Sequence, residues 1–175
     1  MSPHRPTLVA VVLVGLVLAA PLVHAAPPPQ APFVVIVGNN NSLDKGVKSL
    51  RFADDDALRY FELFSLVSKR VALFTVLDKD TARLHPRLAR HARPPEMSAI
   101  LSTLKRFNNQ MKALKAKGKR PELVFVYAGH GDIDKSGEGY INLQRSKLRR
   151  RDLYRKILAP SQASYVHLII DACKS

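Results

Sequence analysis

The sequence predicts an α/β fold in which helices cover both faces of a mainly parallel sheet. Short apolar runs rich in β-branched residues recur along the chain, as expected for buried strands. Segments with apolar residues at helical spacing separate these runs. Such an alternation is typical of parallel strands joined by right-handed crossovers.

The expected elements follow one another along the chain. Strands are expected where the apolar runs lie, at residues 33–38, 71–77, 123–128 and 166–170. Helices are expected at 53–67, which has acidic residues in its first turn, at 97–114, which ends before Gly118, and at 149–158, which Pro160 stops. A small hairpin is expected at 139–143, and a long exposed loop at 81–95.

Length, composition and charge narrow the class of protein. The 175 residues suit a single domain, and 46% hydrophobic with 24% charged residues excludes disorder as the main state. A single cysteine excludes an internal disulfide. The 28 Lys and Arg against 14 Asp and Glu predict non-specific polyanion contact, although solvated helix and loop faces explain the same excess more simply. Sequence-specific nucleic-acid binding is not expected, because no DNA-reading motif is present.

Residues 1–25 have the pattern of a secretory signal peptide. Arg5 precedes an apolar run at 8–20, and Ala25 ends a small-residue cleavage site. The run of 13 residues is shorter than the ~20 that a spanning helix needs, which disfavours an uncleaved anchor. Cleavage after Ala25 predicts a secreted or periplasmic protein without a transmembrane anchor. Residues 26–32 would then form a stiff Pro-rich leader before the domain.

Two chemically capable residues follow two of the expected strands. His130 comes just after the strand at 123–128, and Cys173 just after the strand at 166–170. In an open parallel sheet the ligand site lies at the carboxyl ends of the strands, so the two residues are expected on one rim. An imidazole beside a thiol produces a reactive thiolate, and the Gly131 amide is placed to stabilise an oxyanion.

The segments Tyr-Ala-Gly-His-Gly-Asp at 127–132 and Asp-Ala-Cys-Lys-Ser at 171–175 resemble the caspase and metacaspase superfamily of cysteine peptidases. This resemblance spans residues 33–175 and implies a caspase-like three-layer α/β/α sandwich. It makes Cys173 the nucleophile and His130 its acid/base partner, with the amides of Gly131 and Cys173 as the oxyanion hole. It also implies that the chain holds only the large-subunit portion, cut short after the cysteine strand. A complementing C-terminal chain is therefore an expected partner.

The resemblance also bears on specificity. Metacaspases have an acidic specificity pocket, and the matching positions here are Asp171 and, through a looser match at 50–56, Asp56. The hypothesis is cleavage of a protein or peptide substrate after Arg or Lys, since a carboxylate in a partly dehydrated pocket pairs best with a cation. For Asp54 to Asp56 the alternative is stabilisation of a helix N-terminus, and for Asp171 it is a structural hydrogen bond.

Two further questions stay open at this level. No metal site or cofactor is expected, because Asp132, Asp134 and Glu138 lack the spacing of an EF-hand and suit a solvated acidic turn. Some metacaspases require calcium, so dependence on that ion is open. The alternative function is that of a catalytically silent caspase-like fragment, which acts as a basic binding module for polyanions or for a partner chain.

Overall fold

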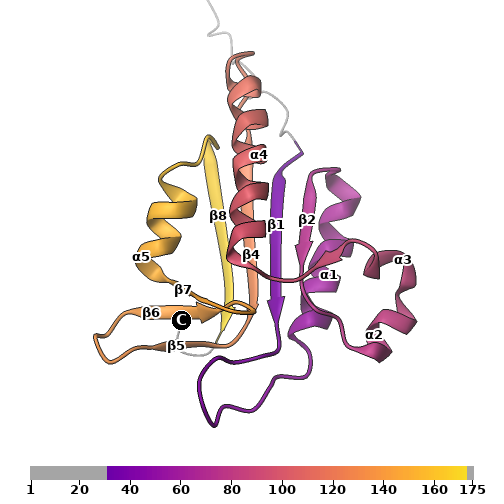
Figure 1. Cartoon of the computed structure of the whole chain (residues 1–175). Coiled ribbons are helices and arrows are strands. Elements are labelled where there is room, and N and C mark those ends of the chain that lie inside the picture. Colours follow the sequence, from indigo (N-terminus) through magenta and orange to yellow (C-terminus); the bar gives the residue numbers. More distant parts are fainter. Residues whose placement is uncertain (1–30, 173–175) are drawn as a thin grey trace, which may run out of the picture.

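The computed structural model describes residues 31–172 (Figure 1). The predicted signal peptide at 1–25, residues 26–30 of the predicted leader and Cys173 lie outside these described residues. Among the described residues, no helix is both long enough and apolar enough to cross a membrane.

A five-stranded parallel sheet forms the centre of the molecule, in the order β3-β2-β1-β4-β8. The strands are β1 (Phe33–Asn39), β2 (Val71–Phe74), β3 (Ala92–Arg93), β4 (Glu122–Gly129) and β8 (Tyr165–Ala172). The four predicted strands are therefore confirmed, and β3 adds a short edge. Because all five strands run the same way, their carboxyl termini share one end of the sheet, below in Figure 1, and their amino termini share the other.

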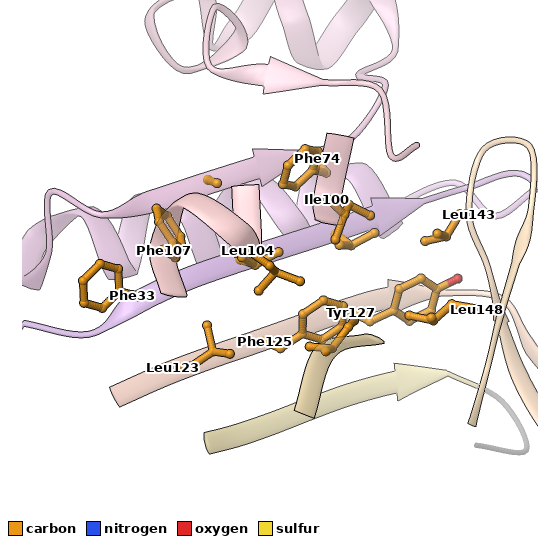
Figure 2. Close-up of a cluster of buried hydrophobic side chains, with 14 of the residues drawn as sticks. Phe33, Phe74, Ile100, Leu104, Phe107, Leu123, Phe125, Tyr127, Leu143 and Leu148 are labelled. Atoms are coloured by element: carbon orange, nitrogen blue, oxygen red, sulfur yellow. The ribbon is translucent and has the colours of Figure 1, made fainter. Parts of the chain in front are cut away.

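Helices cover both faces of this sheet, as the sequence predicts. On one face, α1 (Ala53–Val67) buries Ala57, Leu58 and Phe61 against β1, β2 and β4. On the other, α4 (Met97–Lys115) buries Ile100, Leu104 and Phe107 in a core that includes Phe33, Phe125 and Tyr127 (Figure 2). The result is a three-layer α/β/α arrangement, since each helix presents one apolar stripe and the central strands are apolar on both faces.

A second, antiparallel sheet lies at the carboxyl end of the first (Figure 1). It contains β5 (Gly131–Ile133), β6 (Gly139–Asn142) and β7 (Lys147–Arg149), so it extends the hairpin predicted at 139–143. Its residues Ile141, Leu143 and Leu148 join the core beneath α4 (Figure 2 labels Leu143 and Leu148). The helix predicted at 149–158 is observed as α5 (Arg150–Asp152), which continues into a π-helical segment, η1 (Leu153–Leu158).

The prediction of a long exposed loop at 81–95 is wrong. This segment holds most of α2 (Lys79–Leu84), then α3 (Pro86–Ala89) and the edge strand β3. Asp78 caps α2 by accepting a hydrogen bond from the Thr81 amide at 2.8 Å, and Pro86 begins α3. The strand predicted at 71–77 ends earlier, at Phe74, because the chain turns out of the sheet and leaves Val76 half exposed.

Candidate active site

The strand register brings the ends of β4 and β8 together. Ala128 pairs with Asp171, and Gly129 pairs with Ala172, the last described residue of β8. The next residue after Gly129 is His130, and the next after Ala172 is Cys173. The two strands that precede the predicted histidine and cysteine are therefore neighbours in register at the carboxyl end of the sheet.

Gly129 fixes the path of the chain into His130. Its φ is +154°, and a Cβ added there would lie 2.6 Å from the Tyr127 hydroxyl and 2.7 Å from the Asn39 carbonyl oxygen. Only glycine fits so close an approach of two strands and a buried phenol. The position of His130 thus depends on the packing of β1 against β4.

The backbone of His130 is held by buried hydrogen bonds. Its carbonyl accepts from the Asn142 amide at 2.9 Å, and the Tyr127 hydroxyl lies 2.8 Å from this carbonyl and from that of Asn142. Asn39 donates through Nδ2 to the Asn142 carbonyl at 2.9 Å. Burial raises the pKa of the Tyr127 phenol far above its usual range, so this hydroxyl stays a donor at any physiological pH.

The imidazole of His130 has a defined partner in the loop between β1 and α1. Its Nε2 lies 3.0 Å from the backbone carbonyl oxygen of Lys48. A carbonyl oxygen is only an acceptor, so this contact requires a proton on Nε2. In the neutral ring Nδ1 is then the unprotonated nitrogen, which is the one able to accept a proton from a nucleophile.

This loop is itself tied to the small sheet by a set of contacts that we call the Asp44 clamp. The Asp44 carboxylate accepts from Lys147 Nζ at 2.5 Å, from the Tyr140 hydroxyl at 3.0 Å and from Asn142 Nδ2 at 3.4 Å. The hydrogen bond from Lys147 lowers the pKa of Asp44, and partial burial opposes this shift. The clamp therefore holds the loop that carries the Lys48 carbonyl close to His130.

Gly131, the predicted oxyanion-hole residue, is the first residue of β5. It pairs with Ile141 in the antiparallel ladder between β5 and β6. The Asn142 amide donates to the His130 carbonyl, which makes Gly131 and Ile141 a non-hydrogen-bonded pair. The N–H of Gly131 is consequently turned away from β6.

Asp56 and Asp171 line one pocket at the carboxyl end of the sheet. Its volume is about 220 Å³, and its other lining residues are Leu50, Arg51, Phe52, Ala53, Ala128, Gly129 and Ala172. Partial burial, followed by the nearby charge of Asp171, raises the pKa of Asp56 above 3.8. Among the described residues neither carboxylate forms a salt bridge, although Arg51 also lines the pocket.

The other two aspartates of the cluster have structural roles. Asp54 is fully buried and accepts hydrogen bonds from Asn40 Nδ2 at 2.6 Å and from the Asp78 amide at 3.0 Å. Asp55 accepts from the Thr81 hydroxyl at 2.9 Å. They join the start of α1 to the neighbouring loops, whereas Asp56 faces the pocket.

The acidic turn after β5 is internally neutralised. Asp134 accepts from the hydroxyl and amide of Ser136 and pairs with Arg149, contacts that lower its pKa below the usual range. Glu138 lies 3.7 Å from Arg149 and 3.8 Å from Arg151. No group of three His, Cys, Asp or Glu side chains among residues 31–172 is arranged to hold a metal ion.

The sequence singled out His130, Gly131, Asp56 and Asp171 as candidates, but it did not identify the residues that contact and position them. Asp44 and Lys147 are 103 positions apart, and no local pattern links them. The carbonyl of Lys48 has no side-chain signature at all. Tyr127 belongs to the Tyr-Ala-Gly-His-Gly-Asp segment that carries the resemblance, but no role was predicted for its hydroxyl.

We compared the chain with protein-family models, with curated proteins and with solved structures, and none of the three gave a match. The chemistry of the site therefore carries the functional proposal.

Proposed function

We propose that the protein is a secreted or periplasmic cysteine endopeptidase of caspase-like fold that cleaves peptide bonds after Arg or Lys. The observation that carries this proposal is the pocket shared by Asp56 and Asp171, which lies beside the adjacent ends of β4 and β8. A general base follows one of these strands and a thiol follows the other. A peptidase of this specificity needs at least a nucleophile, a general base and a pocket that binds the cationic side chain of the substrate.

In this mechanism the His130–Lys48 contact sets the tautomer. With its proton on Nε2 donated to the Lys48 carbonyl, His130 accepts the proton of the Cys173 thiol at Nδ1. The thiolate adds to the substrate carbonyl carbon, and the amides of Gly131 and Cys173 donate to the resulting oxyanion. The intermediate then collapses, the C–N bond breaks, and the imidazolium gives its proton to the leaving amine. Water, deprotonated by His130, hydrolyses the thioester and restores the thiol.

The pocket explains the preference for a basic residue. Leu50 and Phe52 offer apolar walls for the methylene stem of a lysine or arginine side chain. The carboxylates of Asp56 and Asp171 meet the cationic head, and its charge relieves the repulsion that raises the pKa of Asp56. Arg51 also lines the pocket, but its guanidinium lies over the Phe52 ring, 5.8 Å from the ring centroid, instead of pairing with either aspartate.

A second candidate function is a catalytically silent module that binds polyanions. A concentration of unpaired basic side chains at the amino end of the sheet favours it, and this surface is described below. Polyanion binding by itself is compatible with peptidase activity, because the basic surface and the acidic pocket lie at opposite ends of the strands; the two candidates differ in whether Cys173 is catalytic.

The first experiment is hydrolysis of fluorogenic peptides that end in Arg, Lys or Asp, with the wild type and a Cys173→Ala variant, with and without calcium. We expect cleavage after Arg and Lys that Cys173→Ala abolishes. Alkylation of Cys173 across a pH series gives an independent readout, because His130 should make the thiol reactive well below its ordinary pKa. A folded protein with no cleavage and ordinary thiol reactivity would contradict the proposal and support the silent module.

A further inference from the structure

The amino end of the sheet gathers cationic side chains from separate parts of the chain. We define the basic end as Lys69, Arg70, Lys112, Lys115, Lys117, Lys119 and Arg120, which come from the start of β2, the last turn of α4 and the approach to β4. All except Arg70 are exposed. Glu122, the acidic residue at the start of β4, lies 3.6 Å from His167 and pairs with none of them.

The basic end differs from the basic segment at 147–156, where four of the cationic side chains are paired with acidic ones. Lys147, Arg149, Arg151 and Lys156 each lie within 4.0 Å of an Asp or Glu oxygen. Within residues 31–172, no member of the basic end forms a salt bridge. Seven like charges that lack acidic partners within the described residues repel one another and create a positive potential that attracts anions.

Exposed aliphatic side chains lie beside these charges. At the end of α1 that approaches Lys69 and Arg70, Leu66 is 80% exposed, Val67 61% and Leu63 56%. Aliphatic side chains interleaved with lysine and arginine are typical of surfaces that contact an anionic membrane. A nucleic-acid surface would instead present aromatic rings for stacking, and the exposed ring at this end, Tyr165, is covered by the Arg120 guanidinium at 5.0 Å.

A groove within the basic end suits a phosphate-bearing headgroup. It has a volume of about 320 Å³ and is lined by Arg70, Gln110, Ala113, Leu114 and Lys117. Two cations and an amide around one depression provide the hydrogen-bond donors that phosphate oxygens require.

The chain also enters the domain at this end. The Ser68 hydroxyl donates to the Pro32 carbonyl at 2.6 Å, and Arg70 Nη1 donates to the Ala31 carbonyl at 3.5 Å. Residues 31 and 32 therefore lie against the basic end, just before β1.

From these observations we infer that the basic end docks on the surface of an anionic phospholipid bilayer. Lys112, Lys115, Lys117, Lys119 and their neighbours contact headgroups, and Leu63, Leu66 and Val67 enter the interface. All strands of the central sheet run from the basic end toward the site (Figure 1). Because His130 follows β4 and the Asp56–Asp171 pocket lies at the carboxyl ends of β4 and β8, the site is at the end of the sheet opposite the docked surface. This inference does not depend on peptidase activity.

The test measures binding of residues 26–175, the form that the proposed cleavage after Ala25 leaves, to vesicles of equal parts phosphatidylglycerol and phosphatidylcholine, and to pure phosphatidylcholine vesicles. The basic-end variant combines Lys112→Gln, Lys115→Gln, Lys117→Gln and Lys119→Gln. The matched control combines Lys79→Gln, Arg83→Gln, Arg87→Gln and Arg90→Gln, which are exposed on or beside α2 and α3 and remove the same charge. All of these proteins lack the apolar run at 8–20, so the difference between them reports the basic end.

A lysine near an anionic surface strengthens binding about fivefold, so the loss of four lysines should weaken binding of the basic-end variant to the charged vesicles by roughly several hundredfold. The control variant should bind like the wild type, and replacing the four lysines by arginine should preserve binding. Equal weakening of both glutamine variants would overturn the inference, as would equally tight binding to pure phosphatidylcholine. Binding of duplex DNA that needs the basic end, without vesicle binding, would overturn it in favour of nucleic acid.

Orientation has its own readout, because the chain contains no tryptophan. Leu66→Trp places a reporter at the basic end, and Leu84→Trp places one on α2, where Leu84 is 66% exposed. On charged vesicles the emission of the first variant should shift to the blue, and that of the second should stay unchanged. The reverse pattern would show that the opposite end docks and would overturn the inference.

Discussion

The two ends of the central sheet differ in charge and in construction. At the carboxyl end, Asp54, Asp55, Asp56 and Asp171 gather, and long connections between elements are fastened by the Asp44 clamp and by buried hydrogen bonds around His130. At the amino end the connections are short. Within residues 31–172 the cations of the basic end form no salt bridge with an acidic side chain. One set of parallel strands therefore separates an organised acidic site from a simple basic surface.

The difference shows that hydrogen-bonded networks occur at the end of the sheet where side chains must be held in one orientation. A hydrogen-bonded network is needed where an imidazole must adopt one tautomer and one orientation. A surface that attracts anions by charge alone needs no such network, because Coulombic attraction acts over several ångströms. We therefore expect substitutions at the carboxyl end to act through geometry, and those at the amino end through charge.

The largest expected effect tests whether the ends are functionally separate. His130→Ala should lower kcat/KM for Arg-ended peptides by about 10²–10⁴, the usual contribution of a general acid/base. The basic-end variant should leave hydrolysis of the same small peptides unchanged. Steady-state kinetics of both variants measure this difference. An equal loss of kcat/KM in the two variants would show that the two ends of the sheet are not functionally separate.

The next effect concerns the charge of the pocket. Asp171→Asn should reduce the preference for an Arg-ended peptide over its neutral citrulline twin by about 10- to 100-fold, since it removes a charge-assisted hydrogen bond. Asp80→Asn is the matched control, because the Asp80 side chain lies on α2 and is 84% exposed. An unchanged ratio in Asp171→Asn would remove this residue from the specificity pocket.

A smaller effect is expected from the Asp44 clamp. Lys147→Met should lower kcat about tenfold by loosening the loop that carries the Lys48 carbonyl, and it should lower the free energy of unfolding by about 1 kcal/mol. Lys156→Met breaks the Lys156–Asp152 pair on the surface and is the control. Nitrogen NMR of the His130 ring separates a positioning role from a structural one, because only the former changes its tautomer.

The sign of the pH dependence of this clamp follows from the lowered pKa of Asp44. The folded state holds the carboxylate ionised to a lower pH than the unfolded state does. The clamp therefore stabilises the fold at pH values above 3.8, and this contribution is lost as the pH falls through the lowered pKa. Chemical denaturation of wild type and Lys147→Met should show a difference that narrows in that acid range.

The smallest expected effect is an increase in the free energy of unfolding, whereas Lys147→Met should decrease it. The raised pKa of Asp56 means that its ionised form opposes folding, so Asp56→Asn should stabilise the protein at neutral pH, by about 0.5 kcal/mol or less because solvent screens an exposed group. The gain should fade as the pH falls through the raised pKa and be lost below 3.8, where the wild-type carboxyl is protonated in both states. Thermal melts across this range measure it, and a loss of stability at neutral pH would contradict the expectation.

The strands and helices that bury a large face were predictable. The runs at 33–38 and 123–128 are continuous and apolar because β1 and β4 are covered on both sides. The stripe along α4 was equally clear. The segment at 81–95 was predicted wrongly, because α2, α3 and β3 are short and their caps, not their apolar pattern, define them.

The sequence alone determined the order of the elements and placed His130 and Cys173 directly after strands, because hydrophobic periodicity is a local property of the chain. Tertiary structure alone decided that β4 and β8 are neighbours in register, that Asp56 and Asp171 share a pocket, and that a carbonyl from the Lys48 loop meets the imidazole. It also decided that cations from three separate stretches meet at one end of the sheet. These contacts join residues tens of positions apart, and long-range packing, which no local pattern encodes, brings them together.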